Sequence, residues 1–341
     1  MILRCKAFPR AALVGNPSDG YFGKTIAFVF RNYCAEVELY ESPELDLLPS
    51  LRDHTTFSGM KELYDEISLY GYYGGIRLLK ASIKKFYEYV CAKSLVIEEK
   101  NFTIRYKSSI PNRLGLAGSS AIITATLRTL CMFYGVKIRS DHFANLILSV
   151  EKGELGIPAG LQDRVAQAYN YPVYMDFDRK YMEKYHVGKY KPIEIKPDLN
   201  LYIAYRTDLS EGSEILHGSL RRKYESGDPG VLAAMQEWAC LTDQVLNSLQ
   251  SGNYEPIPAL LDRNFDLRCE VCADAISDKN RRMVELARKV GASAKFTGSG
   301  GAIIGTYQDE KMFRKLEKTL GEYQISVIKP EIVHNMKDAW L

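Results

Sequence analysis

One segment constrains the fold more than any other. It is the glycine- and serine-rich loop PNRLGLAGSSA at 111–121, which follows an alternating strand pattern at 101–107 and precedes the apolar run AIITATLRTLCMFYG. That run is long enough for a helix, so the loop ends at a helix N-terminus. Glycines accept positive φ and let a backbone approach a ligand closely. The first turn of a helix offers unpaired N–H groups and partial positive charge, which suit a phosphate. The segment predicts a strand–loop–helix unit that binds a phosphate.

A simpler interpretation of this loop stays open, because Ser119 or Ser120 can cap the helix and do nothing more. The loop has neither the G-K-[ST] ending of a Walker A motif nor the G-x-G-x-x-G pattern. On the phosphate-binding interpretation, both hydroxyls donate to phosphate oxygens, and one of them is able to ligate Mg²⁺.

A second glycine-rich segment, KFTGSGGA at 295–302, lies between two short apolar runs. Its glycines fit a tight hairpin that has no ligand. They also fit a nest of backbone N–H groups that faces a phosphate. Both interpretations stay open on the residues alone.

Two carboxylates flank a Gly/Pro-rich turn in EKGELGIPAGLQDRV at 151–165. Glu151 ends one predicted helix and Asp163 begins the next, so both are able to face one cleft. Phosphoryl transfer needs charge neutralisation and in-line placement, for which such a pair is suited. The alternatives are that Glu151 is a solvated helix residue and that Asp163 only stabilises a helix dipole.

The rest of the chain indicates an α+β protein of about two domains, given 341 residues and roughly 100–200 residues per domain. Runs at 25–31 and 34–41 predict a pair of strands, and the polar stretch 178–198 predicts a connection between domains. We place the domains at 1–190 and 191–341. The spacing of the second half predicts helices at 211–224, 230–250, 256–274, 278–290 and 309–320.

Charge and cysteine content narrow the class of protein. The formal net charge is +3 and no block of like charges occurs, which argues against a nucleic-acid partner. The seven scattered cysteines fit free thiols in a reducing compartment. No signal-peptide core and no membrane span is evident, so we expect a cytoplasmic protein without a membrane partner. The oligomeric state is left open.

Three segments together resemble the GHMP kinases, the family of galactokinase, homoserine kinase and mevalonate kinase. The loop at 111–121 resembles the family's Pro-x-x-x-Gly-Leu-Gly-Ser-Ser-Ala motif, with Ala117 as the departure. The start of the chain resembles Pro-Gly-[Arg/Lys]-x-x-Leu-x-Gly-Glu-His-x-Asp, with matches at Pro9, Arg10, Leu13, Gly15 and Asp19. The family's Glu-His is replaced by Asn16-Pro17, which argues against a galactose-like substrate. The segment at 295–302 resembles the third, glycine-rich motif.

The resemblance implies a two-domain architecture, ribosomal protein S5 domain 2-like in the N-terminal half and ferredoxin-like in the C-terminal half. It implies ATP and Mg²⁺ as cofactors, with the metal held by Ser120 and Glu151. It implies that Asp163 accepts or orients the proton of the acceptor hydroxyl, with Arg10 beside it. The implied nucleotide-binding residues are Pro111, Gly115, Leu116, Ala117, Gly118, Ser119, Ser120, Ala121, Gly298, Ser299, Gly300 and Gly301.

Within the family, the strings GNPSDGYFGKT, YYGGIRLL, GIPAGLQDRVAQAY, NFDLR and AKFTGSGGA resemble glucuronokinases. That resemblance implies ATP-dependent phosphorylation of D-glucuronate at its anomeric hydroxyl, giving glucuronate 1-phosphate. A uronic acid brings a carboxylate, which needs a cationic or multi-donor partner. The candidate substrate-binding residues are Asn16, Ser18, Asp19, Tyr21, Tyr73, Arg77, Gln162, Arg164 and Arg268.

Two alternatives stay open at this point. The first is a GHMP kinase for another sugar, such as galacturonate or galactose. The second is a non-catalytic sensor of sugar or nucleotide with the same fold. The presence of Ser120, Glu151 and Asp163 argues against the sensor, since a sensor has no need of metal- and proton-handling groups.

Overall fold

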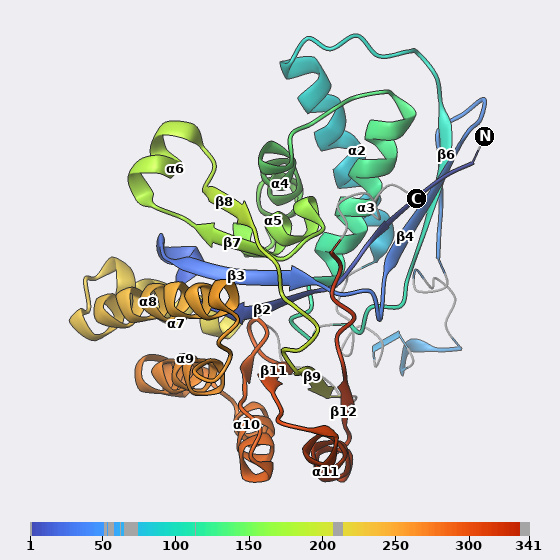
Figure 1. Cartoon of the computed structure of the whole chain (residues 1–341). Helices are drawn as coiled ribbons and strands as arrows, with labels where there is room; N and C mark the ends of the chain where they lie inside the picture. The colour runs from blue at the N-terminus through green and yellow to red at the C-terminus, as the bar shows by residue number, and fades with distance from the viewer. Residues whose placement is uncertain are drawn as a thin grey trace.

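The computed structural model describes residues 2–50, 53, 58–61, 63–64, 74–112, 114–206 and 214–334. These residues form three four-stranded sheets with helices packed on and between them (Figure 1).

The first sheet has the order β1-β4-β6-β5, with β1 (Ile2–Ala7), β4 (Ala35–Glu41), β6 (Phe102–Ser108) and β5 (Asp46–Leu48). Only β5 and β6 are parallel within it. Along β6 the apolar side chains Phe102, Ile104 and Tyr106 are buried, whereas Arg105 and Lys107 face solvent, as the two-residue period of a strand requires. Helix α3 (Gly118–Phe133) covers the apolar face, and α2 (Gly75–Ala92) packs on α3.

The second sheet has the order β2-β3-β7-β8, with β2 (Arg10–Val14), β3 (Lys24–Val29), β7 (Val173–Asp176) and β8 (Lys189–Pro192), all antiparallel. Its two faces are both buried. Ala27 and Val29 point into the cluster formed with α4 (Ser140–Leu148) and α5 (Leu161–Tyr169). Ile26 and Phe28 point into the cluster that contains α8 (Pro229–Ser251). Figure 1 shows this sheet between these two sets of helices.

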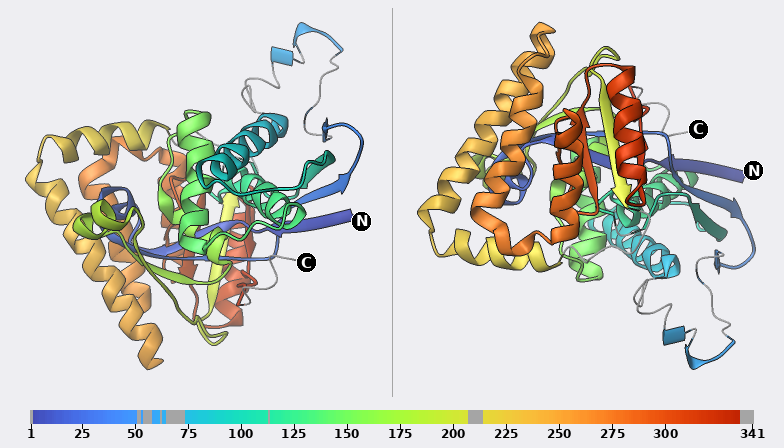
Figure 2. Two further views of the ribbon diagram at one scale, coloured as in Figure 1. Left: turned by 90° about the horizontal axis from the view of Figure 1, so that it is seen from above. Right: turned by 90° about the horizontal axis from the view of Figure 1, so that it is seen from below.

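The third sheet has the order β10-β11-β9-β12, with β10 (Lys295–Phe296), β11 (Ala302–Thr306), β9 (Leu201–Arg206) and β12 (Ile325–Ile328). Helices α10 (Asp278–Val290) and α11 (Glu310–Gly321) pack on one another and on this sheet around a separate apolar cluster. Helix α9 (Ile257–Cys272) lies beside α8 in both views of Figure 2 and joins this sheet to the second one. Helix α7 (Glu214–Glu225) precedes α8, and α6 (Arg179–Tyr185) lies between β7 and β8.

Two expectations about the sheets are wrong. The runs at 25–31 and 34–41 are strands, β3 and β4, but they do not pair, because β3 joins β2 and β7 whereas β4 joins β1 and β6. The stretch 178–198 is not a plain connection, because it contains α6 and β8. Local composition identifies a strand, whereas its partner depends on long-range packing.

The expected domain boundary after residue 190 falls inside β8. Register places Lys191 opposite Tyr174 and Pro192 opposite Val173, so β8 completes the sheet of the first half. The division into 1–190 and 191–341 stays a prediction.

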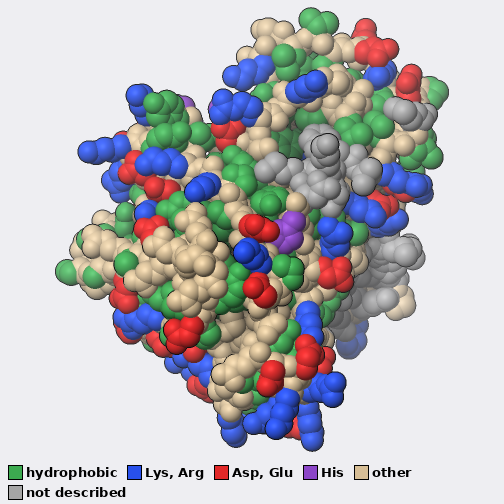
Figure 3. All heavy atoms as spheres, in the orientation of Figure 1, with side chains coloured by type: hydrophobic (Ala, Val, Ile, Leu, Met, Phe, Trp, Pro, Cys, Tyr) green, Lys and Arg blue, Asp and Glu red, His purple; other side chains and the backbone are tan. Residues whose placement is uncertain are grey.

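The surface matches the nearly neutral net charge. On the face drawn in Figure 3, basic and acidic side chains are interspersed over most of the area. In the part of the chain that the structure describes, none of the helices combines the length and the apolar character that crossing a bilayer requires.

Candidate active site

Arg10, the first residue of β2, connects the three segments that the sequence singles out. Its guanidinium donates to the carbonyls of Gly115 at 3.2 Å and Thr297 at 2.5 Å, and its backbone N–H donates to Leu116 at 3.0 Å. Its Nη2 lies 2.6 Å from Oδ1 of Asp163. The expected proximity of Arg10 and Asp163 is therefore present, although the catalytic role of each stays a prediction.

The two glycine-rich segments face one another at backbone contact distance. A Cβ on Gly115 would lie 2.9 Å from the carbonyl oxygen of Gly300, and one on Gly298 would lie 2.8 Å from that of Gly115. Gly115 also has φ of +64°, which favours glycine. The glycines thus let two loops from different halves of the chain meet, which a hairpin alone does not require.

Helix α3 begins directly after this junction. Ala117 is its N-cap, in a left-handed conformation with φ of 60°, and Gly118, Ser119 and Ser120 form the first turn. Pro111 and Ser119 are partly exposed, so the N-terminal end of α3 is accessible beside the Arg10–Asp163 pair. This arrangement is suited to an anion, because unpaired N–H groups and the helix dipole point out of the N-terminus.

Ser120 is buried, and its hydroxyl donates to Oε1 of Gln167 at 2.5 Å. The amide of Gln167 in turn donates to the carbonyls of Phe8 and Ala117, both at 3.0 Å. Gln167 is a residue that the sequence reasoning missed. Its signal was available, since it lies one helical turn after Asp163 on α5. The role of Ser120 as a metal ligand stays a prediction.

The substitution Ser120→Ala distinguishes a metal-binding role of the Ser120 hydroxyl from its structural hydrogen bond to Gln167. We expect weaker Mg²⁺ dependence of nucleotide binding, together with a stability loss of about 1 kcal/mol from the lost bond to Gln167. The measurement is nucleotide affinity against Mg²⁺ concentration, with thermal unfolding alongside. Thr129→Val is the matched control, since it removes another buried hydroxyl of α3, which donates to Ala125 at 2.7 Å. An unchanged Mg²⁺ titration would count against Ser120 as a ligand.

Glu151 lies where α4 opens into a π-helical turn, Ser149–Glu154. Such turns are frequent at functional sites. The carboxylate is buried and paired with Arg164, whose Nε donates to Oε2 at 2.5 Å. Arg164 Nη1 also lies 3.0 Å from Oδ2 of Asp163, so one guanidinium links both carboxylates. Burial raises the pKa of Glu151, an effect that the charge of Arg164 opposes. Burial alone would lower the pKa of Arg164, but Glu151 and Asp163 hold it above its ordinary value.

These residues fit a magnesium ion that arrives with a nucleotide. Both contacts of Arg164 with Glu151 use Oε2, which leaves Oε1 available as an oxygen ligand. Mg²⁺ is commonly held by one or two carboxylates, with phosphates and water completing the shell. The described residues contain no group of three or more His, Cys, Asp and Glu placed to hold a metal by themselves.

Asp19 lies on a short 3₁₀ helix, Ser18–Tyr21, and faces the same charges. A Cβ on Gly160 would lie 3.3 Å from its Oδ2. Burial and the neighbouring Asp163 raise the pKa of Asp19 to about 7, although Arg10 and Arg164 oppose the shift. Near neutral pH this carboxyl is therefore able both to donate and to accept a hydrogen bond, and its role as a substrate contact stays a prediction.

The raised pKa of Asp19 predicts how the unfolding free energy depends on pH. Since the folded-state pKa is raised from 3.8 to about 7, the folded protein holds the Asp19 proton more tightly than the unfolded chain. The contribution of Asp19 to stability is therefore lost as pH rises from about 4 to about 7, by up to about 4 kcal/mol. We expect the difference in unfolding free energy between Asp19→Asn and wild type to grow in favour of the variant across that range. A difference that does not depend on pH would show that Asp19 has an ordinary pKa.

Other expected substrate contacts are bonded within the protein. Ser18 Oγ donates to the carbonyl of Lys24 at 3.0 Å, and Gln162 Nε2 donates to Thr25 at 3.1 Å. Both side chains are buried.

Three further candidates are Tyr21, Arg77 and Tyr73. The ring of Tyr21 is buried with its centroid 4.8 Å from that of Tyr224, and burial raises its pKa to about 12. Arg77 lies partly buried in the first turn of α2. Tyr73 lies outside the described residues. The roles of all three as substrate contacts stay predictions.

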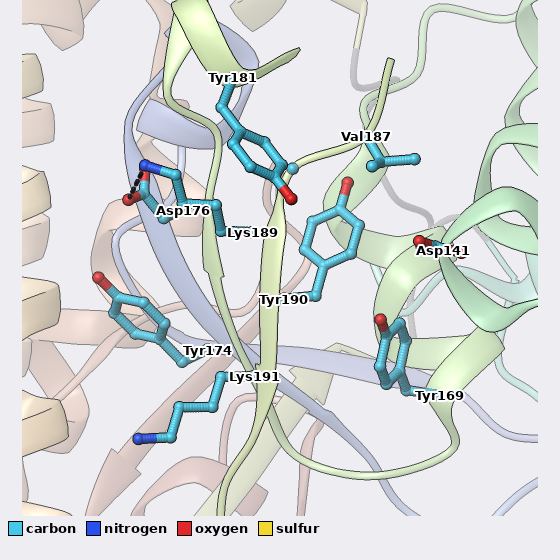
Figure 4. Close-up of a pocket in the computed structure, with 10 residues that line it drawn as sticks. Asp141, Tyr169, Tyr174, Asp176, Tyr181, Val187, Lys189, Tyr190 and Lys191 are labelled. Carbon is cyan, nitrogen blue, oxygen red and sulfur yellow. Dashed lines mark ion pairs between the residues drawn. The ribbon is translucent and has the colours of Figure 1, made fainter. Parts of the chain in front are cut away.

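A cavity of about 420 Å³ lies elsewhere, at the β7–β8 edge of the second sheet. Figure 4 shows Tyr169, Tyr174, Tyr181 and Tyr190 around it, with the ion pair of Lys189 and Asp176 on one side. None of the expected site residues lines this cavity. The tyrosines of the chain therefore include a surface cluster that is separate from the Arg10–Asp163 junction.

Comparisons with known proteins identify the family of the chain. The family model for the GHMP kinases N terminal domain matches residues 78–171, and the model for GHMP kinases C terminal matches residues 245–322. The chain is 41% identical over 304 residues to "Probable glucuronokinase 2" of Arabidopsis thaliana, covering 88% of this chain and 82% of that protein. It is 38% identical over 303 residues to "Glucuronokinase 1" of the same plant, covering 88% and 83%.

The fold of the chain is also similar to that of kinases whose structures have been solved. The structure of the mevalonate kinase of Methanococcus jannaschii superimposes with a TM-score of 0.72 at 19% identity, over 98% of both chains. Sequence models match in both halves, and the similarity to the two plant proteins extends over most of each chain. The chain belongs to the GHMP kinase family and is a kinase, a phosphotransferase with an alcohol group as acceptor.

Proposed function

We propose that this kinase transfers the γ-phosphoryl group of ATP to the anomeric hydroxyl of D-glucuronate and releases glucuronate 1-phosphate and ADP. The observation that carries the proposal is the junction at Arg10, where an ion pair with Asp163 lies against both glycine-rich loops. Similarity to two glucuronokinases over most of the chain supports the choice of acceptor.

The chemistry follows from the charges at the junction. The acceptor oxygen forms a bond to the γ-phosphorus as the bond to the β–γ bridging oxygen breaks, and the hydroxyl proton passes to Asp163. Arg10 forms an ion pair with Asp163 and places positive charge beside the transferred group. The accessible N-terminus of α3 and the turn at 298–301 bind phosphate oxygens through backbone N–H groups. Mg²⁺, held by Glu151 and Ser120, supplies charge neutralisation of the phosphates when bound.

The experiment is ADP release with Mg²⁺-ATP against glucuronate, galacturonate, glucose and galactose. We expect turnover with glucuronate to exceed that with the other acceptors. Turnover with a neutral sugar alone would be consistent with kinase activity but would contradict the assignment of glucuronate as the acceptor. If no sugar gives ADP release while the protein still binds ATP, a non-catalytic sensor would be favoured.

A further inference from the structure

The glycine turn at 298–301 is held by a buried arginine. Arg268 lies on α9 and is 2% exposed, and its expected contact with a sugar carboxylate stays a prediction. Its Nη1 donates to the carbonyl of Gly298 at 2.8 Å, and its Nη2 donates to that of Ser299 at 3.0 Å. The two terminal nitrogens of one guanidinium therefore hold two successive peptide groups of the turn.

No acidic partner accounts for the burial of this charge. Among the described residues, no carboxylate lies within 4 Å of the guanidinium, which lies instead over the ring of Phe296, 4.9 Å from its centroid. Burial lowers the pKa of Arg268 to about 10, so the guanidinium stays charged at neutral pH. A buried charge is costly unless it is paired or hydrogen-bonded. Here the hydrogen bonds are those to the turn.

Two further side chains hold the same stretch of backbone. Arg10 donates to the carbonyl of Thr297 at 2.5 Å, and Nδ2 of Asn16 donates to that of Gly298 at 3.3 Å. Asn16, whose expected contact with the acceptor stays a prediction, is fixed in turn by Lys295 of β10. This buried side chain donates to Oδ1 of Asn16 at 2.5 Å. Three successive carbonyls are thus fixed by side chains.

The fixed carbonyls set the direction of the N–H groups. The peptide bonds of the turn are trans, and in a trans peptide the N–H points opposite to the C=O of the same plane. The N–H groups of Gly298, Ser299 and Gly300 therefore point away from the side chains that hold the carbonyls. Within the described part of the chain none of these three N–H groups has an acceptor, and all three residues are partly exposed. Successive N–H groups so arranged form a nest that suits an anion.

The other end of the turn is fixed as well. Gly300 and Gly301 have φ of +153° and +79°, a region that glycine adopts readily. The N–H of Gly301 donates to Oδ1 of Asn280, on α10, at 3.0 Å. The nest is therefore oriented by contacts within the protein and does not depend on a ligand for its shape.

The nest lies beside the groups that handle the transferred phosphoryl group in the proposed reaction. A Cβ on Gly115 would lie 3.4 Å from the backbone nitrogen of Ser299, so this N–H is next to the loop at 111–121. Arg10, which holds the first carbonyl, also lies 2.6 Å from Asp163. Since Asp163 takes the proton of the acceptor in that reaction, the phosphate nearest to this pair is the terminal one of ATP.

We propose that Arg268 is a positioning residue that fixes the turn at 298–300 so that its N–H groups bind the terminal phosphate of ATP. The inference rests on the proposed function, in which this turn binds phosphate. It deepens that function, because it names the phosphate and the side chain that orients its donors. Arg268 acts from behind the turn, without contact with the nucleotide. The carboxylate of a sugar acid is the other anion that suits such a nest, and the test separates the two.

The test is the substitution Arg268→Met, with affinities for ADP and for the non-hydrolysable ATP analogue AMPPNP measured by calorimetry with Mg²⁺ and without an acceptor. We expect the affinity for AMPPNP to fall about tenfold and that for ADP to stay within about twofold, because ADP lacks the phosphate that the turn binds. In steady state, kcat should fall about tenfold or more, since displaced donors no longer fit the transition state. The KM for glucuronate should stay within about twofold.

Two variants separate positioning from a general loss of stability. Arg268→Lys keeps the charge, but a single ammonium does not reproduce the fork, so it should restore only part of the affinity for AMPPNP. Arg288→Met is the matched control, because Arg288 also lies over a phenylalanine ring and donates to two backbone carbonyls, those of Asp262 and Ala294, outside the turn. Its ratio of AMPPNP to ADP affinity should equal that of the wild type.

Asn280→Ala tests the same turn from its other end, and does so even if Arg268→Met does not fold. It leaves the N–H of Gly301 without its acceptor and disturbs no buried charge. We expect the affinity for AMPPNP to fall about threefold relative to that for ADP.

The outcomes are distinct. An equal loss for AMPPNP and ADP, or no loss in Arg268→Met and Asn280→Ala, would overturn the role of Arg268. Wild-type behaviour of Arg268→Lys, or an equally selective loss in Arg288→Met, would overturn it too. A rise in the KM for glucuronate with unchanged AMPPNP affinity would assign the nest to the sugar carboxylate and overturn the inference. A wild type that does not use glucuronate would overturn the proposed acceptor, whereas a selective loss of AMPPNP affinity would still support Arg268, because that affinity is measured without an acceptor.

Discussion

Replacing Asp163 with asparagine is expected to lower kcat about 10²- to 10⁴-fold while the fold and the affinity for ATP stay close to those of the wild type. The side chain of Asp163 is 17% exposed, and its Oδ1 lies 2.6 Å from Nη2 of Arg10. Asparagine has the same size but neither accepts a proton nor neutralises Arg10. The loss has two sources: the missing proton acceptor and an Arg10 charge that no longer has its partner.

The measurement is single-turnover and steady-state ADP formation, with ATP affinity and circular dichroism as checks on the fold. Asp266→Asn is the matched control, because Asp266 is also paired with an arginine, Arg288, at 2.7 Å but lies on α9 and is not one of the expected site residues. We expect its kcat to stay within about twofold of the wild type, as for a surface ion pair. Turnover by Asp163→Asn at the wild-type rate would remove Asp163 from the mechanism.

Much of the fold is readable from local sequence. The strand at β6, the loop at 111–121 and helix α3 follow from two-residue alternation, glycine content and an apolar run. The helices of the second half were also expected, and α8, α9, α10 and α11 lie close to the expected ranges. These elements are long and strongly patterned, so tertiary packing does not override their local preference.

The pairing of strands, in contrast, could not be predicted from local sequence. β3 and β4 are adjacent in sequence, but each is placed by a different partner, β2 and β1 respectively. β8 was missed because its sequence, KYKP, contains two lysines and a proline and carries little apolar pattern. Its position at the edge of the sheet explains this composition, since an edge strand tolerates proline and charge.

The candidate site also has residues that the sequence identifies and residues that it does not. The resemblance to the family motifs implies that Arg10 and Asp163 lie together, and the structure places them in contact. The buried partners Gln167 and Lys295 were missed, because local sequence does not show that their side chains are buried, although helical spacing places Gln167 on the same face of α5 as Asp163. Their significance arises from what they contact, Ser120 and Asn16, which lie far from them in the sequence.

Replacing Arg164 with methionine is expected to cost about 3–5 kcal/mol of unfolding free energy, because it leaves a buried carboxylate without its partner. The side chains of Arg164 and Glu151 are only 6% and 3% exposed, and Arg164 also contacts Asp163. Methionine fills most of the same volume, so the loss reports charge and not a cavity. The measurement is urea denaturation at neutral pH, without nucleotide or Mg²⁺.

Two further variants separate burial from pairing. Arg263→Met removes an arginine that is also paired with two carboxylates, Glu237 and Glu270, but is 38% exposed, so its expected cost is below about 1 kcal/mol. The double substitution Glu151→Gln, Arg164→Met should recover most of the loss, because residue 151 then carries no charge that needs a partner. A loss for Arg164→Met as small as that for Arg263→Met would mean that solvent reaches Glu151. Burial would then not be the cause of the raised pKa of that carboxyl, and Arg164 would serve to orient Asp163 and not to neutralise Glu151.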